Sequence, residues 1–268
     1  SSLPEDLLWV GDNVSGRRER VIAGSIRRSD VIVGRHVPIS PGAVPRFLAR
    51  WEEAYARLGP FESVLQTAAA HHRLLWIHPF SDGNGRVARL VSYAILLRAL
   101  DTGGLWSIAR GLARDQDQYK QHLAACDLQR RNDLDGRGNL SEEALAEFTR
   151  FFMETCIDQV RFMQQLTEPS ALRSRIVGWA KDEERVGAIP PGSARVLAHV
   201  LTNGTLERHD VPEVTGLNDR AARRVTAALT KRGIIAAITH KAPFTIAFPA
   251  SLAPALLPGL YPSLPARQ

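Results

Sequence analysis

The stretch from His78 to Arg89, HPFSDGNGRVAR, constrains this chain more than any other. It runs into residues 87–100, which are apolar nearly all round and are therefore predicted to form a central buried helix. The start of a helix presents amide groups without intrahelical partners and the positive end of the helix dipole. Glycines at 83 and 85 let the backbone come close to a ligand. We therefore expect an anion to bind where this turn becomes a helix.

The charged side chains of the same stretch indicate which anion. Arg86 and Arg89 are three residues apart, so they project from one face of the predicted helix and can grip a polyphosphate. Asp82 suits a hard cation such as Mg²⁺, which takes carboxylates together with substrate phosphates. His78 supplies a base that titrates near neutrality. This chemistry predicts phosphate-ester transfer from a nucleotide, and the alternative is an ordinary capped helix in a helical bundle.

The same residues resemble the signature of the Fic family, His-x-Phe-x-Asp/Glu-Gly-Asn-Gly-Arg-x-x-Arg, at all eight fixed positions. The Fic family is made largely of enzymes that transfer AMP from ATP to a protein hydroxyl. The resemblance implies a nucleotidyltransferase in which His78 deprotonates a Ser, Thr or Tyr of the target and Asp82 holds Mg²⁺. It also implies the residues that bind the phosphates of ATP, which are Gly83, Asn84, Gly85, Arg86 and Arg89.

Residues 30–38, DVIVGRHVP, are predicted to form a short hairpin with Gly34 near its turn. The hairpin resembles the Fic flap, an edge that pairs with the target's backbone and lays the modified side chain beside the catalytic histidine. Strand addition of this kind binds a backbone without demanding a particular sequence. An ordinary two-stranded edge is the alternative. The residues expected to dock the target are Val31, Ile32, Val33 and Gly34.

The remainder of the first 168 residues is predicted to be helical. His71 and His72 precede the motif closely enough to suggest a metal site, but packing or capping roles are favoured because no cysteine or carboxylate completes a zinc set. A loop beginning at Asp133 resembles a calcium loop, yet Arg137 and Ala144 occupy ligand positions, so a turn before a helix is preferred. The expected helices are 41–58, 61–76, 87–100, 115–126 and a long helix capped by Ser141.

Two further expectations depend on the resemblance alone. It places Tyr119 and Asp127 near the nucleoside, although the family often has paired tyrosines where this chain has Gln-Tyr-Lys. Many Fic proteins are also inhibited by a helix carrying Ser/Thr-x-x-x-Glu-Gly/Asn, whose glutamate pairs with the second motif arginine, here Arg89. Ser1–Glu5 approaches this pattern but is followed by Asp6. An inhibitory element is therefore expected upstream, in a partner, or not at all.

From Ser193 onward the pattern predicts a helix, a short helix, a third helix and two strands, which resembles a winged helix-turn-helix. Asn218 is expected to cap the third helix and Gly233 to end it. This helix carries arginines on one face, as a helix offered to the major groove of DNA would. A solvated face, or a surface for dimerisation or target docking, explains the same pattern. The candidate DNA contacts are Arg220, Arg223 and Arg224.

The predicted fold class is therefore mainly α: a Fic-like helical bundle with a small β-hairpin flap, followed by a winged helix-turn-helix domain. The composition shifts near residues 167–170 and 189–192. The expected domains are a Fic-like catalytic domain at 1–168, a helical connector at 169–190, the winged helix-turn-helix at 191–250 and a Pro/Leu-rich tail at 251–268.

Composition narrows the class of protein. A formal charge of +6 favours acidic partners such as nucleotides. The two cysteines, Cys126 and Cys156, lie in helical segments without metal spacing, so buried reduced thiols in a cytoplasmic protein are expected. There is no membrane-length apolar run and no secretory start, so no membrane partner is expected.

Together these features predict a protein adenylyltransferase that moves AMP from Mg-ATP to a protein hydroxyl. Two alternatives stay open. One is a Fic enzyme that uses another phosphate donor or removes AMP. The other is a DNA-binding regulator whose Fic-like domain senses nucleotide. The candidate partners are ATP, a protein target, DNA and a second copy of the chain.

Overall fold

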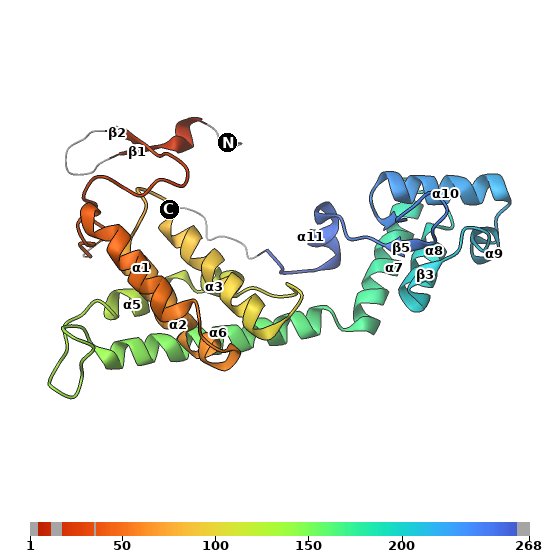
Figure 1. Ribbon diagram of the computed structural model, residues 1–268. Coiled ribbons are helices and arrows are strands. Elements are labelled where there is room, and N and C mark those ends of the chain that lie inside the picture. Colours follow the sequence, from red (N-terminus) through yellow and green to blue (C-terminus); the bar gives the residue numbers. More distant parts are fainter. Residues whose placement is uncertain (1–4, 12–17, 35, 262–268) are drawn as a thin grey trace. The chain divides into compact units, whose positions relative to one another are not determined.

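The structure, a computed structural model, describes residues 5–11, 18–34 and 36–261 and is mainly helical. Backbone contacts divide the chain into two compact units, Ser1–Val160 and Arg161–Gln268 (Figure 1). The division falls inside a helix, before the boundary expected after residue 168. The predicted domain limits at 168, 190 and 250 therefore stay predictions, and each unit is described by itself.

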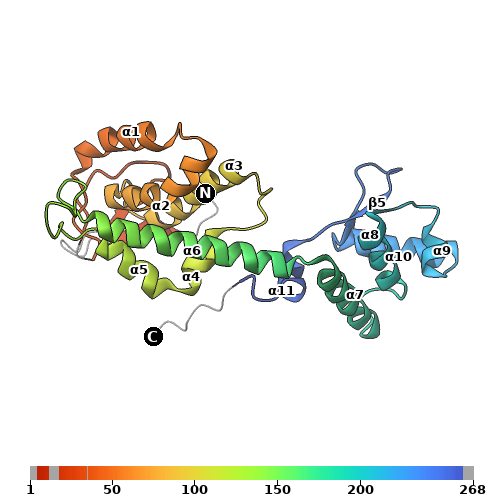
Figure 2. The same cartoon turned by 90° about the horizontal axis from the view of Figure 1, so that it is seen from below.

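The first unit is built around two antiparallel helices joined by the motif loop. These are α2 (Pro60–Ile77) and α3 (Asn84–Leu100), which pack along each other, with α1 (Val44–Tyr55) against α2 (Figures 1 and 2). The helices expected from periodicity are confirmed to within a few residues, and one short helix was not expected. The other helical elements are η1 (Glu5–Leu8), η2 (Pro41–Ala43), the unexpected α4 (Ile108–Arg114), α5 (Gln116–Ala125) and α6 (Glu142–Leu166).

The core of the first unit lies between α2, α3 and α6. Phe148, Phe152 and Cys156 are spaced four apart on α6, so one stripe of that helix is buried. Ile108 and Leu112 of α4 join the same cluster. Full burial of such a side chain contributes about 1.5–3 kcal/mol to folding. This packing fixes α2 and α3, and with them the motif loop at one end of the pair.

The loop before α6 is a turn, as predicted, and not a calcium loop. The Asp135 carboxylate is buried and accepts hydrogen bonds from the Arg131 amide at 3.0 Å, the Ser141 hydroxyl at 2.9 Å and the Glu143 amide at 2.9 Å. Ser141 Oγ in turn accepts from the Ala144 amide at 3.1 Å, which confirms the helix cap.

The hairpin expected at residues 30–38 is reduced to a single antiparallel bridge between Val33 and His36. The carbonyl groups of Ser29 and Ile39, on either side of this segment, accept hydrogen bonds from an arginine guanidinium and not from a partner strand. The first two-stranded pairing lies earlier, between β1 (Trp9–Gly11) and β2 (Arg18–Arg20). The predicted hairpin is therefore present in a minimal form, with Gly34 in its turn and Val33 and His36 as its one described pair.

Residues 1–4 of the candidate inhibitory segment lie outside the described residues. Glu5, its acidic residue, is described in η1 and pairs with Arg20 at 3.1 Å. Both side chains are exposed, so this ion pair contributes little to stability. The described partner of the Glu5 carboxylate is thus Arg20 of β2, and no described contact joins Glu5 to the motif.

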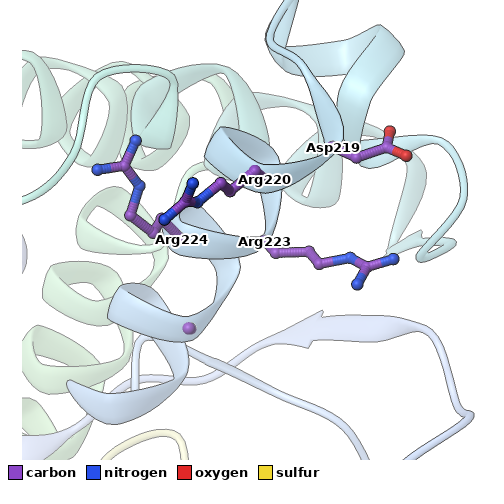
Figure 3. Close-up of a pocket in the computed structure, with 5 residues that line it drawn as sticks. Asp219, Arg220, Arg223 and Arg224 are labelled. Carbon is purple, nitrogen blue, oxygen red and sulfur yellow. The ribbon is translucent and has the colours of Figure 1, made fainter.

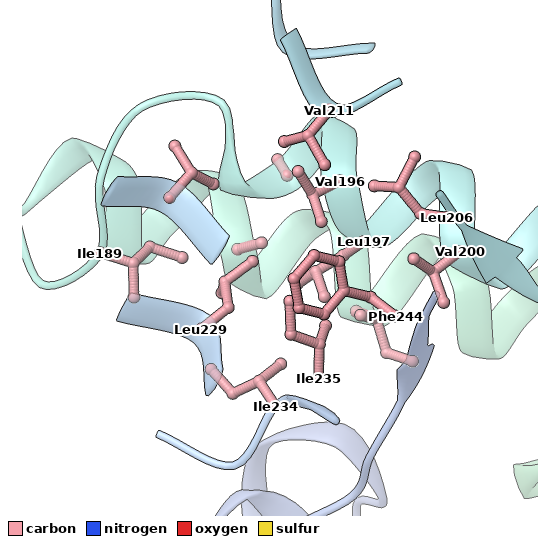
Figure 4. Close-up of a cluster of buried hydrophobic side chains, with 14 of the residues drawn as sticks. Ile189, Val196, Leu197, Val200, Leu206, Val211, Leu229, Ile234, Ile235 and Phe244 are labelled. Carbon is pink, nitrogen blue, oxygen red and sulfur yellow. The ribbon is translucent and has the colours of Figure 1, made fainter. Parts of the chain in front are cut away.

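The second unit packs helices against a small sheet. Strands β3 (Thr205–Leu206), β4 (Ile235–Ala236) and β5 (Phe244–Ile246) are antiparallel in the order β3-β5-β4, with Leu206 opposite Phe244 and Ile235 opposite Ile246. Figure 4 shows the aliphatic side chains that surround Phe244. The helical elements are α7 (Pro169–Arg185), α8 (Ser193–Asn203), α9 (Val211–Thr215), α10 (Asp219–Lys231), η3 (Ala250–Leu252) and α11 (Ala253–Leu256).

The segments expected to be a connector and a tail both contribute to this core. Ile176 and Ala180 of α7 are buried in it, because they are four residues apart on one face of an amphipathic helix. Leu256 of α11 is buried in the same cluster. Asn218 caps α10 as predicted, since its side chain accepts from the Ala221 amide at 3.0 Å.

Two predictions from composition can be compared with the structure. Cys126 and Cys156 are free and buried, and burial raises the pKa of each thiol to about 12, which makes them unreactive. Over the described residues, none of the helices combines the length and the apolar character that crossing a membrane requires.

Candidate active site

His78 forms the bend between α2 and the motif loop. It is the C-cap of α2 and adopts a left-handed backbone conformation, with φ of 51° and ψ of 62°. Its backbone amide donates to the Leu74 carbonyl at 3.1 Å. A residue other than glycine in this conformation costs on the order of 1–3 kcal/mol and persists only when its surroundings hold it. Strain of this kind makes the bend a candidate functional position.

The His78 ring is set up to accept a proton at Nε2. Its Nδ1 lies 3.2 Å from the Leu75 carbonyl, and because a carbonyl only accepts, Nδ1 carries the proton and Nε2 the lone pair. Burial lowers the pKa of His78 below its usual value, and the positive charge of Arg27 lowers it further. The ring is therefore neutral at pH 7, as a general base must be.

The motif loop is closed by Asn84, the first residue of α3. Its Nδ2 donates to the Phe80 carbonyl at 2.7 Å, and its Oδ1 accepts from the Phe80 amide at 3.0 Å. Asn84 is 4% exposed. Asn84 is thus a support for the loop. Its Nδ2 carries a second hydrogen, so the phosphate contact that the resemblance implies stays a prediction.

The start of α3 offers amide groups and two guanidinium groups. Gly83 precedes it with φ of 81°, a conformation that a Cβ disfavours, and its carbonyl accepts from the Val87 amide at 3.0 Å. A Cβ on Gly83 would lie 3.2 Å from Nη2 of Arg86, and one on Gly85 would lie 3.4 Å from Nη1 of Arg89. The glycines therefore give the guanidinium groups room beside the first turn, where an anion is favoured.

Asp82 fits a Mg²⁺ ion that arrives with a polyphosphate. It is half-exposed, and its Oδ2 accepts from Arg86 Nη2 at 2.8 Å. In the described ranges, no group of three or more His, Cys, Asp or Glu side chains is arranged to hold a metal. Mg²⁺ commonly takes one or two carboxylates and completes its shell with substrate phosphates and water, so a single carboxylate is sufficient.

Arg89 is supported from the core by a buried hydrogen-bond relay. The Ser92 hydroxyl donates to the Ala88 carbonyl at 2.9 Å, so it accepts from Nδ1 of His71 at 2.8 Å. The Nε2 atom of His71 then accepts from the Tyr119 hydroxyl at 2.7 Å. The Tyr119 oxygen is in hydrogen-bonding reach of Arg89. These five residues link the core to the second motif arginine.

Burial holds His71 and Tyr119 each in one protonation state. It lowers the pKa of His71 to about 3 and raises that of Tyr119 to about 12. The packing role predicted for His71 is therefore confirmed. Tyr119 was predicted to lie near the nucleoside, but it is 6% exposed and its hydroxyl is engaged by His71. The spacing of α5 turns Tyr119 into the core, and its place near the nucleoside stays a prediction.

Asp127, the other predicted nucleoside neighbour, lies between two histidines. Its Oδ1 accepts from Nε2 of His72 at 3.0 Å, and its Oδ2 lies 3.6 Å from Nδ1 of His36. Burial lowers the pKa of His72, and Nδ1 of its ring is buried without a partner, which fits a neutral ring. Asp127 therefore joins α2 to the segment expected to dock the target.

The residues predicted to dock the target, Val31 to Gly34, are largely exposed to solvent. Ile32 is 61% exposed, and Val33 and Gly34 are also exposed, while Val31 is half-buried. Nε2 of His36 lies 2.9 Å from the Trp76 carbonyl, so the segment is tied to the end of α2, two residues before His78. The segment thus presents apolar side chains close to the end of α2, while the amide and carbonyl of Val33 are paired with His36.

The candidate DNA contacts lie on α10 in the second unit. Arg220, Arg223 and Arg224 are exposed and, with Asp219 and Ala227, line a surface hollow. Arg220 and Arg224 extend to one side of the helix and Arg223 extends to the other (Figure 3). All three line the same hollow, as residues at i, i+3 and i+4 of one helix do, so they share one face of α10 as predicted, and their side chains fan out to either side of it.

Sequence reasoning missed Arg27 and His36 as neighbours of the base. Arg27 Nε donates to the His78 carbonyl at 2.7 Å. In the sequence it is one of two adjacent arginines in a loop, which is typical of a solvated pair. His36 lies in the predicted hairpin, and nothing in its spacing relates it to Trp76 or Asp127. The one sequence feature that could have indicated a buried role for Arg27 is its position directly after the apolar Ile26.

Comparison with known proteins covers the N-terminal part of the chain. Residues 4–96, which include the motif, match the Fic/DOC family. The chain is 40% identical over 97 residues to "Protein adenylyltransferase Fic" of Culex quinquefasciatus, and 39% identical over 100 residues to "Protein adenylyltransferase fic-1" of Caenorhabditis elegans. Each match covers 35% of this chain and 19% of the relative, so the matched part is about a fifth of those proteins' length.

A solved structure, a Fic family protein from Desulfovibrio desulfuricans G20, overlaps with a TM-score of 0.42 and 18% identity, covering 85% of this chain and 63% of that one. The assignment therefore rests on the matched sequence and on the residues it includes: the strained histidine, the glycine-flanked helix start and the two arginines. Through residues 4–96 this chain is similar to the Fic/DOC family and to the protein adenylyltransferases named Fic.

Proposed function

We propose that this protein is a protein adenylyltransferase that moves AMP from Mg-ATP to a hydroxyl group of a protein. The observation that carries the proposal is the pairing of a neutral His78, with Nε2 unprotonated, and a helix start flanked by Arg86 and Arg89. A nucleotide sensor needs the second feature but has no use for the first. The matched relatives, whose names state this activity, support the same assignment.

In the proposed reaction the target's hydroxyl oxygen attacks the α-phosphorus of ATP while His78 Nε2 takes the hydroxyl proton. The bond from the α-phosphorus to the oxygen bridging to the β-phosphate breaks, and pyrophosphate leaves. Arg86, Arg89 and the first amides of α3 bind phosphate oxygens and stabilise the charge that develops. Mg²⁺ bound at Asp82 would supply further neutralisation of the triphosphate.

The target would be presented by the exposed segment Val31–Gly34. Backbone groups of this exposed segment other than those of Val33 would pair with an extended stretch of the target, which would place the target's side chain near the base without requiring one sequence. A single bridge in place of a longer hairpin leaves more of this backbone unpaired. The modified residue would then be a Ser, Thr or Tyr held by position and not by a dedicated pocket.

The test is incubation of the purified protein with Mg-ATP, followed by intact-mass measurement. A gain of one AMP on the protein itself or on an added target establishes both the reaction and the donor. The His78→Ala variant should lose transfer by a factor on the order of 10²–10⁴, the range for removal of a general base, while it still binds nucleotide. Unchanged labelling in this variant would remove His78 from the mechanism.

Donor competition separates the two other Fic activities. If a different nucleotide or phosphate ester labels the protein faster than ATP does, AMP transfer from ATP is not the main reaction. If the protein instead releases AMP from a previously modified target, it acts in the removal direction. Both outcomes keep His78 and the arginines in their roles and change only the substrate.

For the second unit we propose a winged helix-turn-helix that binds DNA through α10. The order of α8, α9 and α10 with the sheet β3-β5-β4, and the exposed Arg220, Arg223 and Arg224, support it. Binding of duplex DNA should weaken steeply with salt, because each phosphate neutralised contributes about −0.9 to the slope of log affinity against log salt. Binding that Arg223→Glu does not weaken would contradict the proposal.

A further inference from the structure

Arg27 is a buried cation whose described hydrogen bonds all go to main-chain carbonyl groups. It is 3% exposed, and its guanidinium donates to the carbonyls of His78 at 2.7 Å, of Ser29 at 2.9 Å and of Ile39. Its own amide donates to the Pro79 carbonyl at 2.9 Å. A guanidinium taken out of water is costly unless its donors are satisfied, so a buried arginine bonded in this way points to a specific role.

The Nε atom of Arg27 holds the backbone of His78, the candidate base. The left-handed conformation of His78 is held by three hydrogen bonds: its amide to the Leu74 carbonyl, its Nδ1 to the Leu75 carbonyl, and its carbonyl to Arg27 Nε. The first two come from α2 itself. Arg27 alone, of these three partners, holds the bend from outside the helix, and so determines the direction in which the chain leaves it.

The Nη1 and Nη2 atoms of Arg27 hold the residues that flank segment 30–38, which contains the predicted docking residues. Ser29 and Ile39 lie on either side of residues 30–38, and both are bonded to the same guanidinium that holds His78. The middle of the segment is tied separately, by His36 to the Trp76 carbonyl. One planar side chain therefore spans both ends of the docking segment and the backbone of the base. A guanidinium has five donors in a fixed fork, which lysine cannot reproduce.

We propose that Arg27 is a positioning residue for the transfer reaction, which sets the distance between the docked target and His78. This rests on the proposed function, because the distance matters only if a docked hydroxyl must reach the imidazole. A displacement of about 1 Å at a reacting group costs roughly 10²-fold in rate. Arg27 makes no described contact with residues 82–89, so its loss should leave nucleotide binding unchanged.

The experiment compares Arg27→Met and Arg27→Lys with Arg28→Met, which removes a neighbouring exposed arginine. Affinity for Mg-ATP is measured by calorimetry and AMP transfer to the protein itself by intact mass. Arg27→Met should bind Mg-ATP within about twofold of wild type and lose roughly 10²-fold in transfer rate. Arg27→Lys should recover part of that loss, because it keeps the charge but not the fork, and Arg28→Met should behave as wild type.

Two outcomes overturn the proposal. If Arg27→Met transfers AMP as fast as wild type, Arg27 does not position the base. If Mg-ATP affinity and transfer fall in parallel, together with a loss of thermal stability, its role is only structural. Where Arg27→Met does not fold, the same comparison is made with Arg27→Lys, which must then show the loss in rate without the loss in affinity.

A measurement without nucleotide separates this inference from the proposed function. The ring nitrogens of His78 are observed by NMR in labelled protein, wild type against Arg27→Lys. If wild type shows no transfer at all, the adenylyltransferase proposal fails, and a displaced His78 signal in Arg27→Lys still upholds the structural link. An unchanged His78 signal contradicts the role of Arg27 whatever the activity.

Discussion

The two units bury different kinds of side chain at their centres. Around α2 and α3 the buried residues include His71, His72, Asn84 and Ser92. Around α8 and α10 the core is mainly aliphatic with Phe244, and its described buried polar residues are small hydroxyl side chains: Ser193, Thr215 and Thr226. Burying polar groups is costly unless they are hydrogen-bonded, and in the first unit His71 bonds to Ser92 of α3, His72 to Asp127, and Asn84 to Phe80 of the motif loop. The difference indicates that the first core holds a site in place and that the second is a packed support.

The largest expected effect tests the second core. Leu197→Ala removes a fully buried side chain and should lower the free energy of unfolding of the second unit by about 2–5 kcal/mol. Hydrogen exchange followed by mass spectrometry should show faster exchange in α8 and unchanged exchange in α2. Ile238→Ala is the control, since Ile238 is 93% exposed and its truncation should change little. Equal loss of protection in both units would contradict the comparison.

An intermediate effect tests the polar core. Tyr119→Phe removes one hydroxyl and leaves Nε2 of His71 buried without a donor, which costs about 1–3 kcal/mol in the free energy of unfolding. It also removes a partner of Arg89, so affinity for Mg-ATP should fall. Tyr261→Phe makes the same chemical change at an exposed position and should be silent in urea unfolding and in calorimetry. A Tyr119→Phe protein as stable as wild type would show that the relay is dispensable.

A smaller effect concerns pH. His78 must be neutral to accept a proton, and its pKa is lowered from the model-compound value of 6.5 by burial, by Arg27 and by His36, against the opposing effects of Leu75 and Asp82. Transfer should therefore persist below pH 6.5 and be lost only as the pH falls through this lowered pKa. His36→Gln removes one of the groups that lower the pKa of His78, so the acid limb of the pH–rate profile should move slightly upward. His240→Gln, in the second unit, is the control, and a limb above pH 6.5 in wild type would contradict the assignment.

The smallest effect on stability is expected at the surface of the second unit. Arg223→Glu replaces an exposed side chain on α10 and should change the free energy of unfolding by no more than about 0.5 kcal/mol. Urea unfolding of this variant and of wild type makes the measurement. A loss above 1 kcal/mol would mean that the charged surface and the core are coupled, which the packing around Phe244 does not suggest.

How far the sequence could predict this molecule depends on the range of the interactions involved. The helices follow from local periodicity, and caps such as Ser141 and Asn218 follow from residue type, so both were predictable. The motif residues were predictable because their chemistry lies within twelve consecutive positions. Contacts between distant segments were not: Arg27 with His78, and His71 with Tyr119, join residues about fifty positions apart.

The small extent of the hairpin at residues 30–38 has the same explanation. Residues 30–38 have the alternation and the turn of a strand pair, and Gly34 does take a positive φ of 62°. The carbonyls on either side are nevertheless bonded to Arg27, a partner that period-two patterning does not reveal. A local β pattern was thus limited in extent by one buried side chain from outside it.

The left-handed backbone of His78 affects how an inactive protein should be made. Replacement by alanine removes the imidazole but also places an ordinary residue in a conformation that only glycine and, less readily, asparagine adopt without much strain. An inactive variant is used to capture the complex with the target protein. In His78→Ala the backbone turn at this position can change its conformation, and the target is then released. Asparagine at this position is the better choice for capturing complexes, because it abolishes proton transfer while it leaves the corner of the main chain intact.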